Sequence, residues 1–255
     1  MDKKTHGDGV SRPHIKPTRY KHKNPISYTL GMTVTMELIM YKPETVDAVF
    51  FGMEIEENEN TVKLRNLCVK HNIPIEKNNK IFNILSPKGN CFVIGMFHKF
   101  DTPLTNDSHL LFVNPSDSGN MGTIIRTTLG FGIRNIAIIK PAVDIFDPKT
   151  IRASMGALFH INIEYFECIE SYRQRFSTHK LYAFMLDAVI PIQKAIFSAP
   201  YTLIFGNEAS GLAPGYADFC ETIVIPHSSD IDSLNLTLAV GIALYTVNSN
   251  SFISN

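Results

Sequence analysis

The second half of the chain repeats one pattern, in which a short apolar run is followed by a segment of helical length. The runs are rich in Ile, Leu, Val and Phe, as expected for strands that are buried on both faces. Six such runs are present: LLFVN, NIAIIK, INIEYF, LYAFML, YTLIFG and ETIVIP. Their alternation with helical segments predicts an α/β fold with a mostly parallel sheet and helices on both faces.

The first half predicts a smaller α/β layer. Two helical stretches, GMTVTMELIMYKPE and ENTVKLRNLCVKHN, alternate with strand-like runs at VDAVFF, IPIEK and CFVIGMF. The segment HKFDTPLTNDSH then interrupts the apolar pattern with Asp, Thr, Pro and Asn, which is typical of a linker. We therefore expect a small domain over residues 25–98, a linker over 99–109 and a larger domain over 110–250.

The chain has no overall charge, because 24 Lys and Arg residues balance 24 Asp and Glu residues. Binding to a polyanion would therefore depend on local patches. One basic block stands out, residues 1–24, and its cations are Lys3, Lys4, Arg12, Lys16, Arg19, Lys21 and Lys23. We expect a flexible basic tail that either contacts a polyanion or is solvated disorder without a partner.

Other features bear on compartment and metals. The first residues lack the apolar core of a secretory signal, and no run approaches the roughly 18 apolar residues of a membrane span. The cysteines show neither CxxC nor Cys/His ligand spacing, which disfavours a structural zinc site or a disulfide framework. They are Cys68, Cys91, Cys168 and Cys220. We expect a cytoplasmic protein without a metal, whose cysteines fill the core.

The stretch GNMGTIIRTT, residues 119–128, follows shortly after the first apolar run of the large domain. Ligands of open parallel sheets bind beyond the carboxyl ends of strands, so this stretch is a candidate binding loop. We expect Asn120 to cap a helix that begins at Met121, and Gly122 to leave its first turn open to a ligand. Arg126 follows within two turns. A plain helix cap followed by a surface arginine would give the same pattern.

The glycines of this stretch disfavour dinucleotide binding. They form G-x-x-G rather than G-x-G-x-x-G, and Lys140-Pro141 stand where an acidic residue would bind the ribose. The same absence disfavours an ordinary Rossmann methyltransferase. No G-K-[ST] sequence is present, so the stretch is not a P-loop either.

Two further loops follow apolar runs. In FGNEASGL, residues 205–212, Gly206 permits close approach to the backbone and Glu208 places a carboxylate at the end of a strand. IPHSSDIDSLNLTLAVGIALY, residues 225–245, leads from a polar loop, with Ser233 and Asn235 at its end, into a helix without a polar face. Such a helix must be buried all round, which suggests a second copy of the chain as a partner. Each loop alone is also typical of an ordinary turn or cap.

In this order, NMGTIIRT, FGNEASGL and IPHSSDIDSLNLTLA resemble the three motifs of the SpoU/TrmH family of RNA 2′-O-ribose methyltransferases, part of the SPOUT superfamily. RASMGALFH, residues 152–160, resembles a segment that the family carries between the first two motifs. The resemblance covers residues 110–249. The small domain resembles, more loosely, the L30e-like domain with which many members bind RNA.

The resemblance implies an α/β fold with a C-terminal trefoil knot, a homodimer with its active site at the interface, S-adenosylmethionine as cofactor and rRNA or tRNA as substrate. By motif, the implied catalytic and site-shaping residues are Asn120, Arg126, Glu208, Ser233 and Asn235. The implied cofactor contacts are Gly206, Ile225 and Leu234. This chain departs from the family at His227, where Met is frequent, and in the small residues of EASG.

The chemistry of ribose methylation fits these residue types. The 2′-oxygen gains negative charge as it attacks, so a preplaced cation such as Arg126 stabilises the transition state. A guanidinium gives up a proton reluctantly, so we expect Arg126 to orient and stabilise the alkoxide rather than to act as the base. His160 is more typical of a packed histidine than of an acid or base. Two alternatives stay open: a catalytically inactive knot protein that binds RNA, and an unrelated NAD(P)-dependent oxidoreductase.

Overall fold

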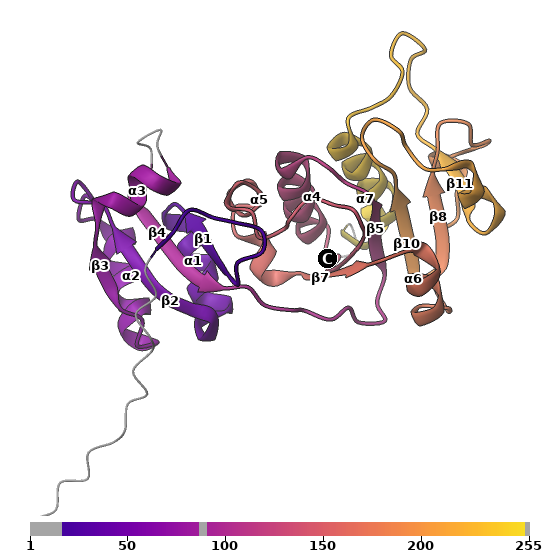
Figure 1. Ribbon diagram of the computed structural model, residues 1–255. Helices are drawn as coiled ribbons and strands as arrows, with labels where there is room; N and C mark the ends of the chain where they lie inside the picture. The colour runs from indigo at the N-terminus through magenta and orange to yellow at the C-terminus, as the bar shows by residue number, and fades with distance from the viewer. Residues whose placement is uncertain (1–16, 87–90, 253–255) are drawn as a thin grey trace, which may run out of the picture.

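The computed structural model describes residues 17–86 and 91–252, so Met1–Lys16 of the predicted basic tail lie outside the described residues. Figure 1 shows a smaller N-terminal domain beside a larger C-terminal domain, joined by an extended segment. Within the described residues, no helix has both the length and the apolar character needed to cross a membrane. The same residues contain no cluster of His, Cys, Asp or Glu side chains that would hold a metal ion.

The small domain is built on a four-stranded sheet in the order β1-β4-β2-β3. Strand β4 runs antiparallel to both β1 and β2, and β3 runs parallel to β2. The strands are β1 (Ile26–Leu30), β2 (Val46–Phe51), β3 (Ile75–Lys77) and β4 (Val93–His98). The helices are α1 (Met32–Tyr41), the short 3-10 helix η1 (Pro43–Thr45), α2 (Glu59–Lys70) and α3 (Asn79–Leu85). The sequence predicted neither β1 nor α3.

The large domain has a seven-stranded sheet in the order β7-β6-β5-β10-β8-β11-β9. Every pair of neighbouring strands is parallel, which confirms the predicted fold class. The strands are β5 (His109–Val113), β6 (Asn135–Ile139), β7 (Asn162–Phe166), β8 (Lys180–Phe184), β9 (Ile190–Pro191), β10 (Tyr201–Phe205) and β11 (Glu221–Val224). The six apolar runs correspond to all of them except the short edge strand β9.

Helices cover both faces of this sheet. The helical elements are α4 (Ser118–Gly130), α5 (Pro148–Ala153), η2 (Ala157–His160), α6 (Ile169–Arg175), η3 (Ile192–Lys194), η4 (Pro214–Asp218) and α7 (Leu236–Phe252). Alternate residues of β5 point to opposite faces, as in any strand. Leu110 packs in the same core as Ile124 of α4 and Val240 of α7, whereas Leu111 packs with Tyr172 of α6.

The core on the α4 and α7 side continues into the small domain. At the junction, Phe97 and Phe100 from the small-domain side meet Phe146 and Phe159 of the large domain, with ring centroids 5.2–6.3 Å apart. These aromatic contacts bury apolar surface between the domains.

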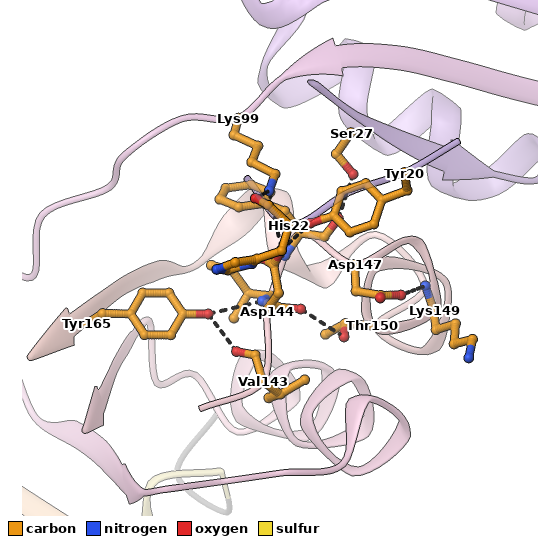
Figure 2. A network of polar contacts seen from close by, with 12 residues as sticks. Tyr20, His22, Ser27, Lys99, Val143, Asp144, Asp147, Lys149, Thr150 and Tyr165 are labelled. Carbon is orange, nitrogen blue, oxygen red and sulfur yellow. Dashed lines mark hydrogen bonds and ion pairs between the residues drawn. The ribbon is translucent and has the colours of Figure 1, made fainter. Parts of the chain in front are cut away.

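A polar network beside these rings centres on Asp144 (Figure 2). Its carboxylate accepts hydrogen bonds from the Tyr20 hydroxyl, from His22 Nδ1 at 2.6 Å and from Lys99 Nζ at 3.2 Å. Burial raises the pKa of Asp144, but the bonds from Tyr20 and His22 outweigh burial and lower the pKa overall. Tyr20 and His22 belong to the segment that the sequence assigned to a flexible tail. Because both side chains have partners on the large domain, that expectation does not hold for them.

The connecting residues 99–108 contain no helix or strand, and they lie against the large domain. Thr102 Oγ1 accepts a hydrogen bond from Ile163 N at 3.0 Å, and Thr105 N donates to Asn135 Oδ1 at 3.1 Å. The connection is therefore held along β6 and β7.

The cysteines are all free. Cys68 and Cys91 are buried and Cys220 is half-buried, in line with a role in the core. Cys168 is exposed beside the start of α6, so the prediction of core filler is wrong at this position.

Candidate active site

Three loops meet around the carboxyl ends of the central strands. Ligands of open α/β sheets bind beyond the carboxyl ends of the strands. Strand β10 lies between β5 and β8, and β11 lies next to β8. A pocket of about 210 Å³ lies beyond the ends of β8, β10 and β11, between the loop after β10 and the loop that leads from β11 to α7. Its walls include Gly206, Glu208, Ile225, Ser233 and Leu234.

Gly206 is required by the fold of the β10 loop. A Cβ atom at this position would lie 2.1 Å from the carbonyl carbon of Gly211 and 2.4 Å from Leu212 N. The loop folds back on itself, because Gly211 N donates to Asn207 O at 2.9 Å and Gly211 has a positive φ of 65°. The backbone itself therefore forms one wall of the pocket, and only glycine fits at this point.

Glu208 ties two of the loops together. Its carboxylate accepts hydrogen bonds from the Ser116 hydroxyl at 2.9 Å and from the backbone N–H groups of Ser116 and Asp117 at 3.2 Å. Burial raises the pKa of Glu208, but these bonds and one from its own backbone outweigh burial and lower the pKa. Glu208 is therefore ionised at neutral pH, and it holds the start of α4 against the pocket rather than contacting Arg126.

Helix α4 begins earlier than the sequence predicted. Asp117 is its cap, because the Asp117 carboxylate accepts a hydrogen bond from Asn120 N at 2.7 Å. Asn120 is the third residue of the helix, so the prediction that it caps a helix from Met121 is wrong. Asp is as strong a cap as Asn, and here it comes first in the chain. The side chain of Asn120 has no hydrogen-bond partner among residues 17–86 and 91–252.

The expected role of Gly122 is also wrong. This glycine is buried, and a Cβ atom on it would lie 2.5 Å from both Ala153 Cβ and Thr150 O. Gly122 therefore permits α4 to pack closely against α5, and it does not open the first turn to a ligand.

Arg126 lies on the exposed face of α4, in a shallow hollow that it shares with Thr123, Thr127 and Phe131. It forms no hydrogen bond or ion pair with any described residue. Neither Arg126 nor Asn120 belongs to the walls of the pocket. In a single chain the site residues thus form two groups, one around the pocket and one on α4.

The residues before α7 divide in a similar way. Ser233 and Leu234 line the pocket, whereas Asn235 caps α7 by accepting a hydrogen bond from Thr237 N at 2.8 Å. His160 lies away from the pocket, where its Nε2 is 2.6 Å from Glu37 Oε2 and its ring contacts the tilted ring of Tyr41, with centroids 3.7 Å apart. These contacts favour the interpretation of His160 as a packed histidine.

Sequence reasoning missed the part of the wall that follows β8. Phe184, Met185 and Leu186 line the pocket, and so does Ser210. The run LYAFML had indicated a strand there, and the rule that ligands lie beyond strand ends could have extended the site to its last residues. His227 also lines the pocket, and the sequence had marked it only as a departure from the motif.

Fold and site together define an α/β protein with a ligand pocket at the carboxyl edge of a parallel sheet. The model of the SpoU rRNA Methylase family matches residues 107–245, more than half of the 255 residues. The chain belongs to this family, as its three motifs predicted.

Curated relatives and solved structures agree with this assignment. The chain is 29% identical over 144 residues to a 23S rRNA (uridine(2479)-2′-O)-methyltransferase from Streptomyces viridochromogenes, an alignment that covers 53% of this chain and 50% of that protein. It is 30% identical over 139 residues to the 23S rRNA (guanosine(2553)-2′-O)-methyltransferase RlmP from Bacillus subtilis, covering 53% and 56%. The chain thus spans about half the length of the curated relatives it matches.

Among solved structures, the SpoU methyltransferase AviRb from Streptomyces viridochromogenes, in complex with AdoMet, superimposes with a TM-score of 0.75. Identity is 20%, and the superposition covers 91% of this chain and 92% of that one. The likeness extends over both domains, and it confirms the predicted α/β fold.

Proposed function

We propose that the protein is a cytoplasmic, S-adenosylmethionine-dependent methyltransferase that methylates a ribose 2′-hydroxyl in rRNA or tRNA. One observation carries the proposal: residues of two separate motifs, Gly206 and Glu208 after β10 and Ile225, Ser233 and Leu234 before α7, line a single pocket. Two relatives that are named 23S rRNA 2′-O-methyltransferases support the reaction and the class of substrate.

The walls of the pocket suit S-adenosylmethionine. Leu234, Leu236 and Ala239 offer apolar surface, while Gly206 and Gly211 expose backbone groups that can bind the polar edges of a ligand. The carboxylate of Glu208 lies in the wall, so it would attract a cationic sulfonium. When bound, this cofactor supplies an electrophilic methyl group.

Arg126 is proposed as the residue that acts on the RNA. Its guanidinium is exposed and has no partner among the described residues, so it is free to bind a substrate anion. It would orient the ribose and stabilise the negative charge that develops on the 2′-oxygen. Asn120 lies six residues earlier on α4, and its side-chain amide, which has no hydrogen-bond partner among the described residues, could fix the same ribose.

The division of the site into two groups supports a homodimer. Leu238, Ile242 and Tyr245 are 59%, 39% and 65% exposed, and their spacing places them on one face of α7. The helix expected to be buried all round therefore keeps an apolar stripe in the single chain. We propose that a second copy covers this stripe, and that the α4 residues and the pocket are brought together across the interface. Light scattering at micromolar concentration tests this; a monomer would contradict it.

The small domain and the basic tail are proposed to hold the RNA. Arg19, Lys21 and Lys23 are the described cations of the tail segment, and further cations precede them. If they neutralise phosphates, RNA affinity falls with salt, and removal of residues 1–16 flattens the dependence. An unchanged salt slope would leave the tail as solvated disorder.

The reaction is tested with purified protein, isotopically labelled S-adenosylmethionine and unmodified total RNA, in the presence of a chelator. We expect label in ribose 2′-O-methyl nucleosides after nuclease digestion and mass spectrometry. Cofactor and RNA binding without any transfer would instead indicate the inactive RNA-binding alternative. Mapping of 2′-O-methyl groups in cells with and without the gene identifies the nucleotide.

A further inference from the structure

The pocket wall contains two ionisable side chains, Glu208 and His227. His227 is half-buried in the loop between β11 and α7, and its Nδ1 lies 2.8 Å from the carbonyl oxygen of Ile225. A carbonyl oxygen only accepts hydrogen bonds, so Nδ1 carries the proton of the neutral ring. Nε2 is then an acceptor, and none of the described residues forms a hydrogen bond with it.

Protonation would convert this ring from a neutral acceptor into a cation with a second donor. Such a change of charge would matter here, because the only other ionisable group in the wall is Glu208, whose lowered pKa keeps it anionic at neutral pH. The wall residues that follow β8 and those from α7 carry no charge.

Two more carboxylates lie on the loop of His227 itself, Asp230 and Asp232. Both are exposed and outside the pocket wall, and Asp230 Oδ2 accepts a hydrogen bond from the Ser228 hydroxyl at 2.7 Å. Water screens exposed charges of this kind. The charge of His227 therefore determines whether the pocket is anionic overall or close to neutral.

We propose that His227 is a specificity-determining residue, which sets the relative affinity of the pocket for the sulfonium cofactor and for its demethylated product. The inference rests on the proposed function. S-adenosylmethionine and S-adenosylhomocysteine differ by one methyl group and one positive charge. With a neutral His227, the carboxylate of Glu208 favours the cation. With a protonated His227, the two wall charges offset each other, and the neutral thioether gains relative affinity.

The test is calorimetric titration of the full-length protein with each of the two ligands between pH 5.5 and pH 8.5. The ratio of the S-adenosylmethionine Kd to the S-adenosylhomocysteine Kd should rise on the order of tenfold as the pH falls, because a unit positive charge added to the wall opposes the charge that only the sulfonium carries. Because the ligands share every other group, changes elsewhere in the pocket largely cancel in this ratio.

Three variants sharpen the measurement. His227→Gln keeps a polar side chain that cannot be protonated, so its ratio should stay constant with pH. His227→Lys holds a permanent cation and should favour the product at every pH. His71→Gln makes the same chemical change at the end of α2 in the small domain, and it should retain the wild-type pH dependence.

The outcomes separate the two proposals. A wild-type protein that binds neither ligand at pH 8.5 overturns the proposed function and this inference with it. Binding of both ligands with a pH-independent ratio overturns only the role of His227, as does a pH dependence that survives in His227→Gln.

Discussion

The two ends of the large sheet use the same strands in opposite ways. Beyond the carboxyl ends of β5 and β10, Glu208 in the wall of the open pocket accepts four hydrogen bonds, three of which come from Ser116 and Asp117. At the amino ends, His109 of β5 and Thr202 of β10 are buried and bonded through Tyr172. At the carboxyl end, polar groups are available to a ligand. At the amino end, buried polar side chains form hydrogen bonds with one another.

The buried end forms a continuous network. The Tyr172 hydroxyl lies 2.7 Å from both His109 Nδ1 and Thr202 Oγ1, and His179 Nδ1 lies 2.9 Å from the same Thr202 oxygen. Burial lowers the pKa of His109 to about 4 and also lowers the pKa of His179. Both rings are therefore neutral at physiological pH. Histidines and hydroxyls of this sheet therefore differ by position: those beyond the carboxyl ends of the strands face the pocket, where open α/β sheets bind ligands, and those at the amino ends pair with one another.

The largest expected effect is at the open end, for Gly206→Ala. The new methyl group would collide with the backbone of Gly211 and Leu212, so the loop must move and the pocket wall with it. We expect S-adenosylmethionine affinity to fall by roughly 100-fold or more, since such overpacking costs about 1–3 kcal/mol and further distorts the site. Gly215→Ala is the matched control, because its nearest neighbour would be 3.9 Å away. Equal affinity in the two variants would show that the Gly206 backbone is not a binding wall.

Arg126→Ala should separate catalysis from both binding and stability. We expect a methylation rate on the order of 100-fold lower under single-turnover conditions, the usual cost of losing one preorganised donor to a developing oxyanion. Cofactor affinity should stay close to wild type, because Arg126 is outside the pocket wall. Arg126→Lys keeps the positive charge but loses the planar guanidinium with its paired N–H donors. A rate well below wild type would therefore indicate that Arg126 orients the substrate through two hydrogen bonds. A wild-type rate for the folded, dimeric alanine variant would remove Arg126 from the mechanism.

Tyr172→Phe tests the closed end. It removes the hydroxyl that joins His109 to Thr202 and leaves buried polar atoms without a partner. The free energy of unfolding should fall by about 1–3 kcal/mol, measured by urea denaturation, with cofactor affinity unchanged. Tyr41→Phe, which removes an exposed hydroxyl outside the α7 stripe, serves as the control. If Tyr172→Phe weakened cofactor binding more than stability, the proposed division between the two ends would be wrong.

The smallest effect at neutral pH is expected from the titration of His109, because this effect develops only in acid. His109 binds a proton near pH 6.5 in the unfolded chain but only near pH 4 in the folded one, so between these values the unfolded state binds more protons. Its contribution to stability is complete above pH 6.5 and is lost as the pH falls toward 4. Denaturation midpoints at pH 7, 6, 5 and 4.5 should show this loss, and His109→Gln should show less of it. If the denaturation midpoints of the wild type and of His109→Gln fell equally as the pH is lowered, the loss of stability could not be assigned to His109.

Much of the sheet was predictable because buried parallel strands appear in a sequence as bare apolar runs. Strand β1 was missed since its ISYTL sequence contains Ser27 and Thr29, which are buried only because the fold supplies partners for them. The Ser27 hydroxyl donates to Phe146 O, 119 residues away, and Thr29 Oγ1 lies 2.7 Å from Thr35 Oγ1. No local pattern reports such partners.

The site shows the same limit. Motif order was enough to bring Gly206, Glu208 and Leu234 to one pocket, because each directly follows or precedes a recognisable element. The cap of α4 is Asp117 rather than Asn120, although both residue types are good caps. The role of Gly122 depends on its contact with α5, which no local pattern in the sequence reveals. The network of His109, Tyr172 and Thr202 joins residues from three elements, so only the fold reveals it.

The aromatic junction between the domains has a practical consequence for dissecting the protein. Phe97 and Phe100 lie on one side of it, and Phe146 and Phe159 lie on the other. If the chain were cut within residues 99–108, each fragment would expose an apolar surface that is buried in the whole protein, and such surfaces promote aggregation. The cut would also separate Tyr20 and His22 from Asp144. The stability and binding of an isolated fragment would therefore differ from those of the same domain in the intact protein. The contribution of the small domain is better measured with single substitutions on its outer surface than with truncated proteins.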